Sequence, residues 1–368
     1  MKFKNPGLKI LDLYIIKKFL GTYFFAIAMI IVVFVVFDYV EHIDDFVELK
    51  APVSKILFDY YLNFIPQFIN QFSGLFTFIA VIFFTSKMAY QTEIIAILSA
   101  GVSFRRLLWP YFLSAMAITL LSVGLNMVVI PAATLHKVEF EKQFNKKKLK
   151  QNTMFDKNIY RQIDQGVFAY VRNYSGVTNQ ASFLAIEQYE GSTMSASLEA
   201  ASVTFNPETG RWVADRYNLR RFDGEREIFE QRERLDTLIN LDAAELGRVQ
   251  DLIKTMNIGR LNSFIAQQRR KGSNMINIFE VERHNRFAYP ISSLVLTLIG
   301  VSLSSRKVRG GTGLHIGIGV ALCFSYILFS KFAEEFAKGG VVPPAIAVWI
   351  PNILFSVIAV YLYKKAPK

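Results

Sequence analysis

The side-chain types that most often carry out catalysis or bind metals are scattered along this chain rather than grouped. The four histidines form no His-Glu-x-x-His pair; they are His42, His136, His284 and His315. No Gly-x-x-x-x-Gly-Lys-Ser/Thr sequence is present, so the chain has no P-loop to hold the phosphates of ATP. The acidic stretch 41–45 could bind a metal ion, but a solvated loop explains the same residues, and no metal site is predicted.

Glu93 is the best candidate for a functional side chain, because it opens a short amphipathic stretch, about residues 91–101, between two long apolar segments. A carboxylate favours a helix N-terminus, with Thr92 as a possible N-cap, and this explanation is purely structural. The functional alternative is a salt bridge from Glu93 to a basic residue of a cytoplasmic ATPase. Gly101 would end the helix, and its apolar side chains would fill a groove on that ATPase; these are Ile94, Ile95, Ile97 and Leu98.

Six apolar stretches are long enough to place these residues on membrane-spanning helices, since about twenty residues cross the hydrocarbon. They cover about residues 15–38, 57–88, 104–130, 285–303, 314–332 and 345–363. The second stretch contains Pro66 among several amides, which predicts a kinked entry that faces protein rather than lipid. The first stretch lacks a cleavage site and is expected to remain as a span.

The distribution of Lys and Arg predicts the orientation of the spans. Basic residues precede the first span, separate the second from the third and the fourth from the fifth, and follow the sixth, whereas the opposite loops are acidic or mixed. By the positive-inside rule both termini are therefore expected in the cytoplasm. Residues 1–131 would hold three spans, 132–284 a periplasmic segment, and 285–368 the last three spans.

Within the long outer segment the pattern changes to short alternating strands with Gly, Asn and Pro turns. This pattern is typical of a β-sandwich or jelly roll, expected over about residues 153–245. The helical stretch 139–151 is expected to extend the third span, and 258–271 to lead back to the membrane. The predicted fold is thus an α-helical membrane part plus a periplasmic β-jelly roll, with strands at 166–171, 182–186, 202–205, 211–214 and 218–222.

Two further groups of residues could form contact surfaces. The fifth span begins with small residues at helical spacing, Gly313, Gly317 and Ala321, which would let a second helix approach closely, either within the chain or from a related subunit. A jelly roll open along one edge could pair with another β-protein or hold acyl chains. Core packing explains the candidate aromatic lining equally well; its members are Phe168, Tyr170, Phe183, Phe205 and Trp212.

The composition supports a membrane protein with a sizeable soluble part. The 368 residues are 52% hydrophobic and 14% aromatic, with a net charge of +12. Because the basic residues lie beside apolar runs, they indicate topology rather than nucleic-acid binding. The single cysteine, Cys323, allows neither a disulfide within the chain nor a cysteine-based metal cluster.

Along essentially its whole length the chain resembles the lipopolysaccharide-export permeases, the LptF/LptG (YjgP/YjgQ) family. The stretch from Thr92 to Ser103 and the segment Tyr289-Pro290-Ile291-Ser292 are the most specific matches when taken together. The opening Leu11-Asp12-Leu13-Tyr14-Ile15 favours the LptG-like member. The other matches are Phe205-Asn206-Pro207-Glu208 through Trp212 and Gly340-Val341-Val342-Pro343-Pro344.

The resemblance implies half of a heterodimeric ABC exporter in the inner membrane of a Gram-negative bacterium. Its implied partners are a second LptF/LptG-type permease, a cytoplasmic ATPase dimer that binds ATP and Mg, a periplasmic jelly-roll bridge protein and lipopolysaccharide. The chain itself would bind no cofactor. Glu93 carries over as the ATPase contact, and the first and fifth spans as lateral gates, with Phe34, Gly313, Gly317 and Ala321 at the permease interface.

One departure from the family pattern bears on the substrate. The LptG-like relatives carry lysines just after the first span, suited to lipid phosphates, whereas here Glu41 to Asp45 is acidic and Lys50 follows later. The substrate would then be less phosphorylated, or divalent cations would bridge. Two alternatives stay open: a permease for lipoproteins or another glycolipid, and a membrane-anchored scaffold that binds periplasmic proteins.

Overall fold

The computed structural model describes residues 9–145, 156–175, 178–224, 226–239, 241, 249–270, 273, 275–305 and 312–366. The chain divides into two compact units. The membrane unit comprises Met1–Glu41, Leu57–Thr134 and Glu280–Lys368. The β unit comprises His42–Ile56 and Leu135–Phe279.

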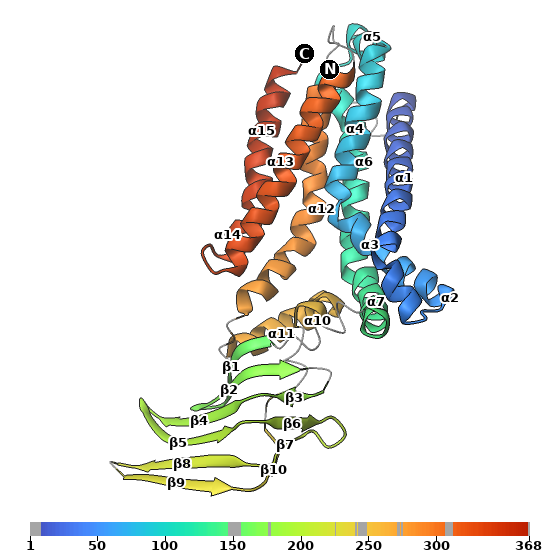
Figure 1. Cartoon of the computed structure of the whole chain (residues 1–368). Helices are drawn as coiled ribbons and strands as arrows, with labels where there is room; N and C mark the ends of the chain where they lie inside the picture. Colours follow the sequence, from blue (N-terminus) through green and yellow to red (C-terminus); the bar gives the residue numbers. More distant parts are fainter. Residues whose placement is uncertain are drawn as a thin grey trace. The chain divides into compact units, whose positions relative to one another are not determined.

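Six helical segments of the described residues are long and apolar enough to cross a membrane, which confirms the predicted number and order of spans. They are Ile10–Glu48, Ser73–Tyr90, Phe104–Phe144, Ile276–Ser304, Gly317–Lys338 and Pro344–Lys365. In Figure 1 these segments carry the labels α1 (Ile10–Glu48), α4 (Ser73–Tyr90), α6 (Phe104–Gly124), η2 (Leu125–Val129, unlabelled), α7 (Ile130–Phe144), α12 (Ile276–Ser304), α13 (Thr312–Lys338), α14 (Pro344–Ala347) and α15 (Ile350–Lys365).

The second predicted span is broken into pieces, as its proline and amides indicated. After the short α2 (Val53–Lys55) come a π-helical turn, η1 (Ile56–Tyr61), and α3 (Leu62–Gln71), which contains Pro66. Phe72 interrupts the chain before α4 begins. Asn70 and Ser73, on either side of this break, are almost fully buried, so the polar entry faces protein.

A buried polar network stabilises the kinks of neighbouring helices in the membrane unit. Pro290 in α12 has no N–H, so the carbonyl of Arg286 loses its helical donor. The side-chain amide of Asn126, in η2, donates to that carbonyl at 3.1 Å. Asn126 also accepts from Asn70 at 2.9 Å, and Ser122 donates to Asn70. The carbonyl released by Pro290 is therefore satisfied by a side chain rather than left exposed to lipid.

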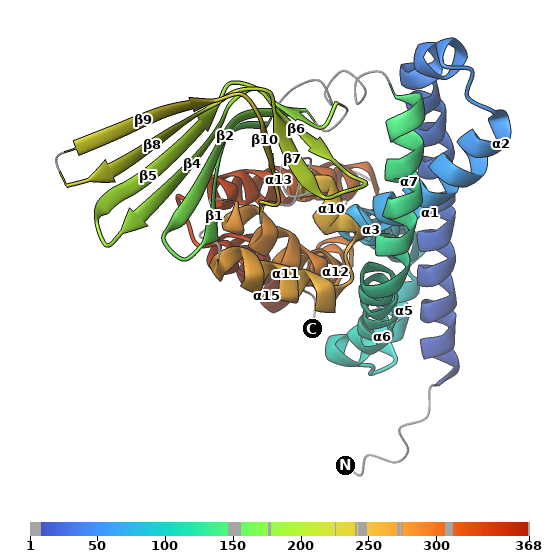
Figure 2. The same cartoon turned by 90° about the horizontal axis from the view of Figure 1, so that it is seen from below.

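The β unit is built on one antiparallel sheet that divides into two arms. β2 pairs with β1 on one side, and on the other side with β3 and β4 in succession. From β3 one arm continues through β6, β7 and β10, and from β4 the other continues through β5, β8 and β9 (Figure 2). The strands are β1 (Asp156–Asp164), β2 (Val167–Ser175), β3 (Gln180–Ala181), β4 (Leu184–Glu190), β5 (Thr193–Ala200), β6 (Val203–Asn206), β7 (Arg211–Ala214), β8 (Tyr217–Asp223), β9 (Arg226–Arg232) and β10 (Leu235–Thr237).

Every predicted strand is present, as β2, β4, β6, β7 and β8, and the antiparallel β domain is confirmed. Two helices, α10 (Val249–Thr255) and α11 (Ile258–Arg270), follow the sheet, and α11 matches the predicted 258–271 closely. α7 ends at Phe144, and residues 146–151 of the predicted extension lie outside the described residues. The core of this unit forms around Trp212, whose ring is fully buried and whose indole N–H donates to the carbonyl of Leu241 at 3.2 Å.

Candidate functional site

The predicted amphipathic stretch forms a separate short helix, α5 (Glu93–Ser99), between the ends of α4 and α6. Both of its ends are turns with left-handed residues: Thr92 has φ of 61° and Gly101 has φ of 82°. Figure 1 shows α5 at the same end of the membrane unit as the start of α1 and the end of α15. Three segments that the sequence predicts to be cytoplasmic therefore lie together at one end of the membrane unit.

Thr92 does not cap α5 in the predicted way. Its backbone is left-handed, and its hydroxyl donates to the carbonyl of Gln91 at 2.6 Å instead of accepting from the helix. An N-cap of the usual kind needs an extended backbone conformation, which aims the side-chain oxygen at the free N–H groups of the first turn.

The Glu93 carboxylate is bound within the chain by two residues of α1. It accepts from the hydroxyl of Tyr14 at 2.9 Å, and both of its oxygens lie 3.4 Å from the Lys18 ammonium. Lys18 also lies over the Tyr14 ring, 4.3 Å from its centroid. The Glu93 side chain stays 30% exposed, so a further donor could still reach it.

The apolar residues of α5 divide into a buried and an exposed set. Ile94 is fully buried in the main core cluster of the membrane unit, and Ile97 and Leu98 pack partly against the same cluster. The prediction that Ile94 anchors α5 in a partner's groove is therefore corrected, because its side chain packs within its own chain. Ile95 is 45% exposed and is the large apolar side chain that α5 presents outward.

A second ion pair joins the same end of α1 to the start of α6. Arg106 donates from both terminal nitrogens to the two oxygens of Asp12, at 2.7 and 2.6 Å. Asp12 is nearly fully buried and also accepts from the backbone N–H of Lys9 at 2.9 Å. Sequence reasoning missed this pair; the available signal was an isolated carboxylate among the lysines that precede the first span.

The three predicted small residues of α13 face open space, unlike the nearby Gly319. A side chain added at Gly313 or Gly317 would meet nothing within 4 Å, and Ala321 is exposed. A side chain at Gly319 would collide with Ile82 of α4. The face carrying Gly313, Gly317 and Ala321 is thus not used for packing among the described residues.

Phe34 and Lys50, two further predicted contact residues, lie in different surroundings. Phe34 packs within its own chain, with its ring centroid 5.4 Å from that of Phe64 and 4.1 Å from that of Phe68. Phe34 is half-buried in this packing, and its role at a permease interface stays a prediction. Lys50 is exposed in the turn that follows α1, where its backbone is left-handed with φ of 52°.

The five aromatic residues predicted as a candidate lining of the β domain lie on two different faces of the sheet, so the structure does not bring them together in one groove. Trp212 lies in the core together with Ala169 and Val171 of β2. Phe168 and Tyr170 alternate with those two residues and so lie on the opposite face of the strand.

Phe183 packs with the aromatic residues on the face of the sheet opposite its core. Its ring centroid lies 6.0 Å from that of Tyr170, and the Arg172 guanidinium lies over it at 4.7 Å. Phe168 meets Tyr189, whose hydroxyl donates to Glu187 at 3.0 Å, and this bond raises the pKa of Tyr189. These aromatic side chains lie on the face of the sheet opposite its core and do not line an apolar channel.

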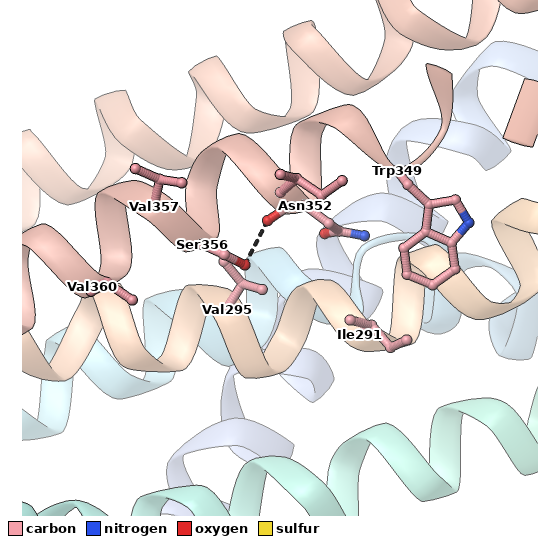
Figure 3. A pocket seen from close by; sticks show the side chains of 8 residues that line it. Ile291, Val295, Trp349, Asn352, Ser356, Val357 and Val360 are labelled. Atoms are coloured by element: carbon pink, nitrogen blue, oxygen red, sulfur yellow. Dashed lines mark hydrogen bonds between the residues drawn. The ribbon is translucent and has the colours of Figure 1, made fainter. Parts of the chain in front are cut away.

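An apolar groove runs along the membrane unit between α12 and α15 (Figure 3). Inside it, the Ser356 hydroxyl donates to the backbone carbonyl of Asn352 at 2.6 Å, so the polar groups there are partly satisfied within the helix. The groove lies on helices apolar enough to face lipid; its lining is Ile291, Val295, Trp349, Asn352, Ile353, Ser356, Val357 and Val360. Among the described residues, no three His, Cys, Asp or Glu side chains group as a metal site would require.

A comparison with protein families identifies the family of the chain. One family model, described as lipopolysaccharide export system permease LptF/LptG, matches residues 13–365. The chain belongs to the LptF/LptG family. A comparison with curated proteins finds no match. As an LptF/LptG permease, the chain is a multi-pass protein of the inner membrane that takes part in lipopolysaccharide transport with other components. Because the model covers both members, the LptG-like assignment stays a prediction.

Proposed function

We propose that this chain is one permease subunit of an ABC exporter that extracts lipopolysaccharide from the inner membrane and passes it to a periplasmic jelly-roll bridge. The observation that carries the proposal is α5, a short helix between two membrane-spanning helices that presents a carboxylate and an exposed isoleucine. A partner helix or groove can recognise such a pair of groups, one charged and one apolar.

ATP hydrolysis belongs to a partner in this proposal. The sequence has no P-loop motif, so ATP and Mg would bind to a cytoplasmic ATPase dimer. Closure of that dimer would move α5, and the permease pair would narrow its lipid cavity. Force therefore enters at the end of the membrane unit where α5 lies.

The second permease would contact the open face of α13. Small residues on a lipid-exposed helix allow the close helix approach that stabilises association in membranes. The β unit would receive the lipid on the periplasmic side, with both termini in the cytoplasm. Its antiparallel sheet offers strand edges for continuation by another β-protein.

The proposal is tested by purifying the chain from its native membrane and identifying the proteins that co-elute. We expect an ATPase and a second permease in the same complex, with lipopolysaccharide as the bound lipid by mass spectrometry. Bound lipoprotein or another glycolipid would identify a different cargo. A complex without any ATPase would contradict the transport function and favour a scaffold.

A further inference from the structure

The two turns that connect α5 to α4 and to α6 can act as hinges. On one side the chain turns at Thr92 and on the other at Gly101, both with positive φ. Gly101 has nothing within 4 Å of the position where a side chain would stand. Short turns of this kind can absorb changes of φ and ψ, so a displacement of α5 need not be passed on to α4 or α6 through the backbone.

The side-chain bonds of α5, by contrast, lead to α1. Glu93, the first residue of α5, accepts from Tyr14 and Lys18, which lie one turn apart on α1. Ile94 is buried in a cluster that contains Ile15 and Phe19 of α1 together with residues of α4 and α6. The polar bonds of Glu93 thus hold the beginning of α5 to α1, while its apolar contacts are shared among the helices of this cluster.

The Asp12–Arg106 pair joins the same end of α1 to the first turn of α6, the helix that follows α5. Arg106 follows α5 by seven residues and makes two parallel charge-assisted hydrogen bonds to Asp12. Such bidentate pairs fix orientation as well as distance. Because the Asp12 side chain is only 2% exposed, solvent screens this bond less than an ordinary surface pair.

We propose that Tyr14, Lys18 and Asp12 are positioning residues that make α1 the helix to which the displacement of α5 is transmitted. The inference rests on the proposed function, because it assumes that an ATPase moves α5. In this arrangement Glu93 serves two neighbours at once: it stays bonded to α1 while its exposed side accepts from the ATPase. α5 and the first turns of α1 then move as one body, and α1 carries the motion into the membrane.

The test uses the complete complex in lipid nanodiscs or vesicles, and measures lipid released per ATP hydrolysed. The double variant Tyr14→Phe with Lys18→Gln removes both donors and leaves Glu93 for the ATPase. We expect the ATPase to remain bound while lipid release per ATP falls by about tenfold. Lys17→Gln, an exposed neighbour with the same loss of charge, should leave the ratio unchanged, and Lys18→Arg should preserve it.

The Asp12–Arg106 pair is tested in the same assay. Arg106→Gln should lower the ratio in the same direction, whereas Arg105→Gln, at the exposed position beside it, should not. Spin labels at Ser99 on α5 and at Phe25 on α1 report the motion in a Cys323→Ala background. With these contacts intact we expect the α5–α1 distance to stay constant through the ATP cycle, and in the double variant we expect it to change during the cycle.

The outcomes separate this inference from the proposed function. Failure of any ATPase to bind the unaltered complex overturns both. A bound ATPase with an unchanged ratio in the double variant and in Arg106→Gln overturns the transmission role alone, even if those variants are thermally less stable. Should the double variant not assemble, Lys18→Gln and Arg106→Gln alone decide in the same way.

Discussion

At the scale of single residues, burial determines what α5 can offer to a partner. Ile94 is fully buried, while the Glu93 carboxylate is partly exposed and Ile95 points outward. Two adjacent isoleucines thus have different roles, one in the core of the membrane unit and one at its surface. The charged group and the large apolar side chain that α5 offers to a partner are therefore the Glu93 carboxylate and Ile95.

Glu93→Arg tests this surface directly. The substitution places a cation beside Lys18, removes the acceptor of Tyr14, and presents the wrong charge to a basic site on an ATPase. We expect ATP-driven lipid release to fall by at least about tenfold. Gln91→Arg, which adds a cation to the same loop while keeping the carboxylate, is the matched control. Unchanged release by Glu93→Arg would show that the carboxylate has no role in coupling.

Trp212 and Phe168 provide a second residue-scale comparison, in the β unit. Trp212 is fully buried, so Trp212→Ala should cost about 3–5 kcal/mol of the unit's free energy of unfolding by leaving a cavity. Phe168 lies on the outer face, and Phe168→Ala should cost about 1 kcal/mol or less. Amide hydrogen exchange in β6 and β7 of the full chain measures both. Equal losses of protection would contradict the assignment of the two faces.

At the scale of elements, sequence patterns predicted the six spans and half of the ten strands of the described residues, but not their buried faces. Long apolar runs marked the spans, and alternation marked β2, β4 and β6. β9 was not predicted, because almost every one of its side chains is exposed and polar residues flank its two apolar ones. Alternation alone shows that a strand has two faces, and tertiary packing decides which one is covered.

The candidate site shows the same limit. Glu93 could be singled out because it is an isolated carboxylate between two spans. Its hydrogen bond to Tyr14 joins residues 79 positions apart, and no local pattern encodes such a contact. The Asp12–Arg106 pair spans 94 positions and was missed for the same reason.

Gly317 and Gly319 give an element-scale prediction, because they lie on opposite sides of α13. Gly317→Leu should leave the fold of the chain intact and weaken its association with a second permease, since the face is open. Gly319→Leu should instead lower the thermal stability of the isolated chain, because the side chain collides with Ile82. Co-purification and thermal unfolding in detergent measure the two effects. Loss of stability in Gly317→Leu with normal association would place the interface elsewhere.

At the scale of the whole molecule, the account depends on which side of the membrane each unit occupies. The start of α1, α5 and the end of α15 lie at one end of the membrane unit (Figure 1), and positive charges near the spans predict that this end is cytoplasmic. The β unit would then belong to the periplasm. Both placements are needed if force enters at α5 and lipid leaves through the β unit.

Side-specific cysteine labelling tests this claim most directly. In a Cys323→Ala background, Ser99→Cys on α5 and Gln188→Cys on β4 each place one thiol at an exposed position. We predict that an impermeant reagent labels Gln188→Cys in cells with a permeabilised outer membrane, and Ser99→Cys only after the inner membrane is opened. Labelling of Ser99→Cys while the inner membrane is intact would contradict the account.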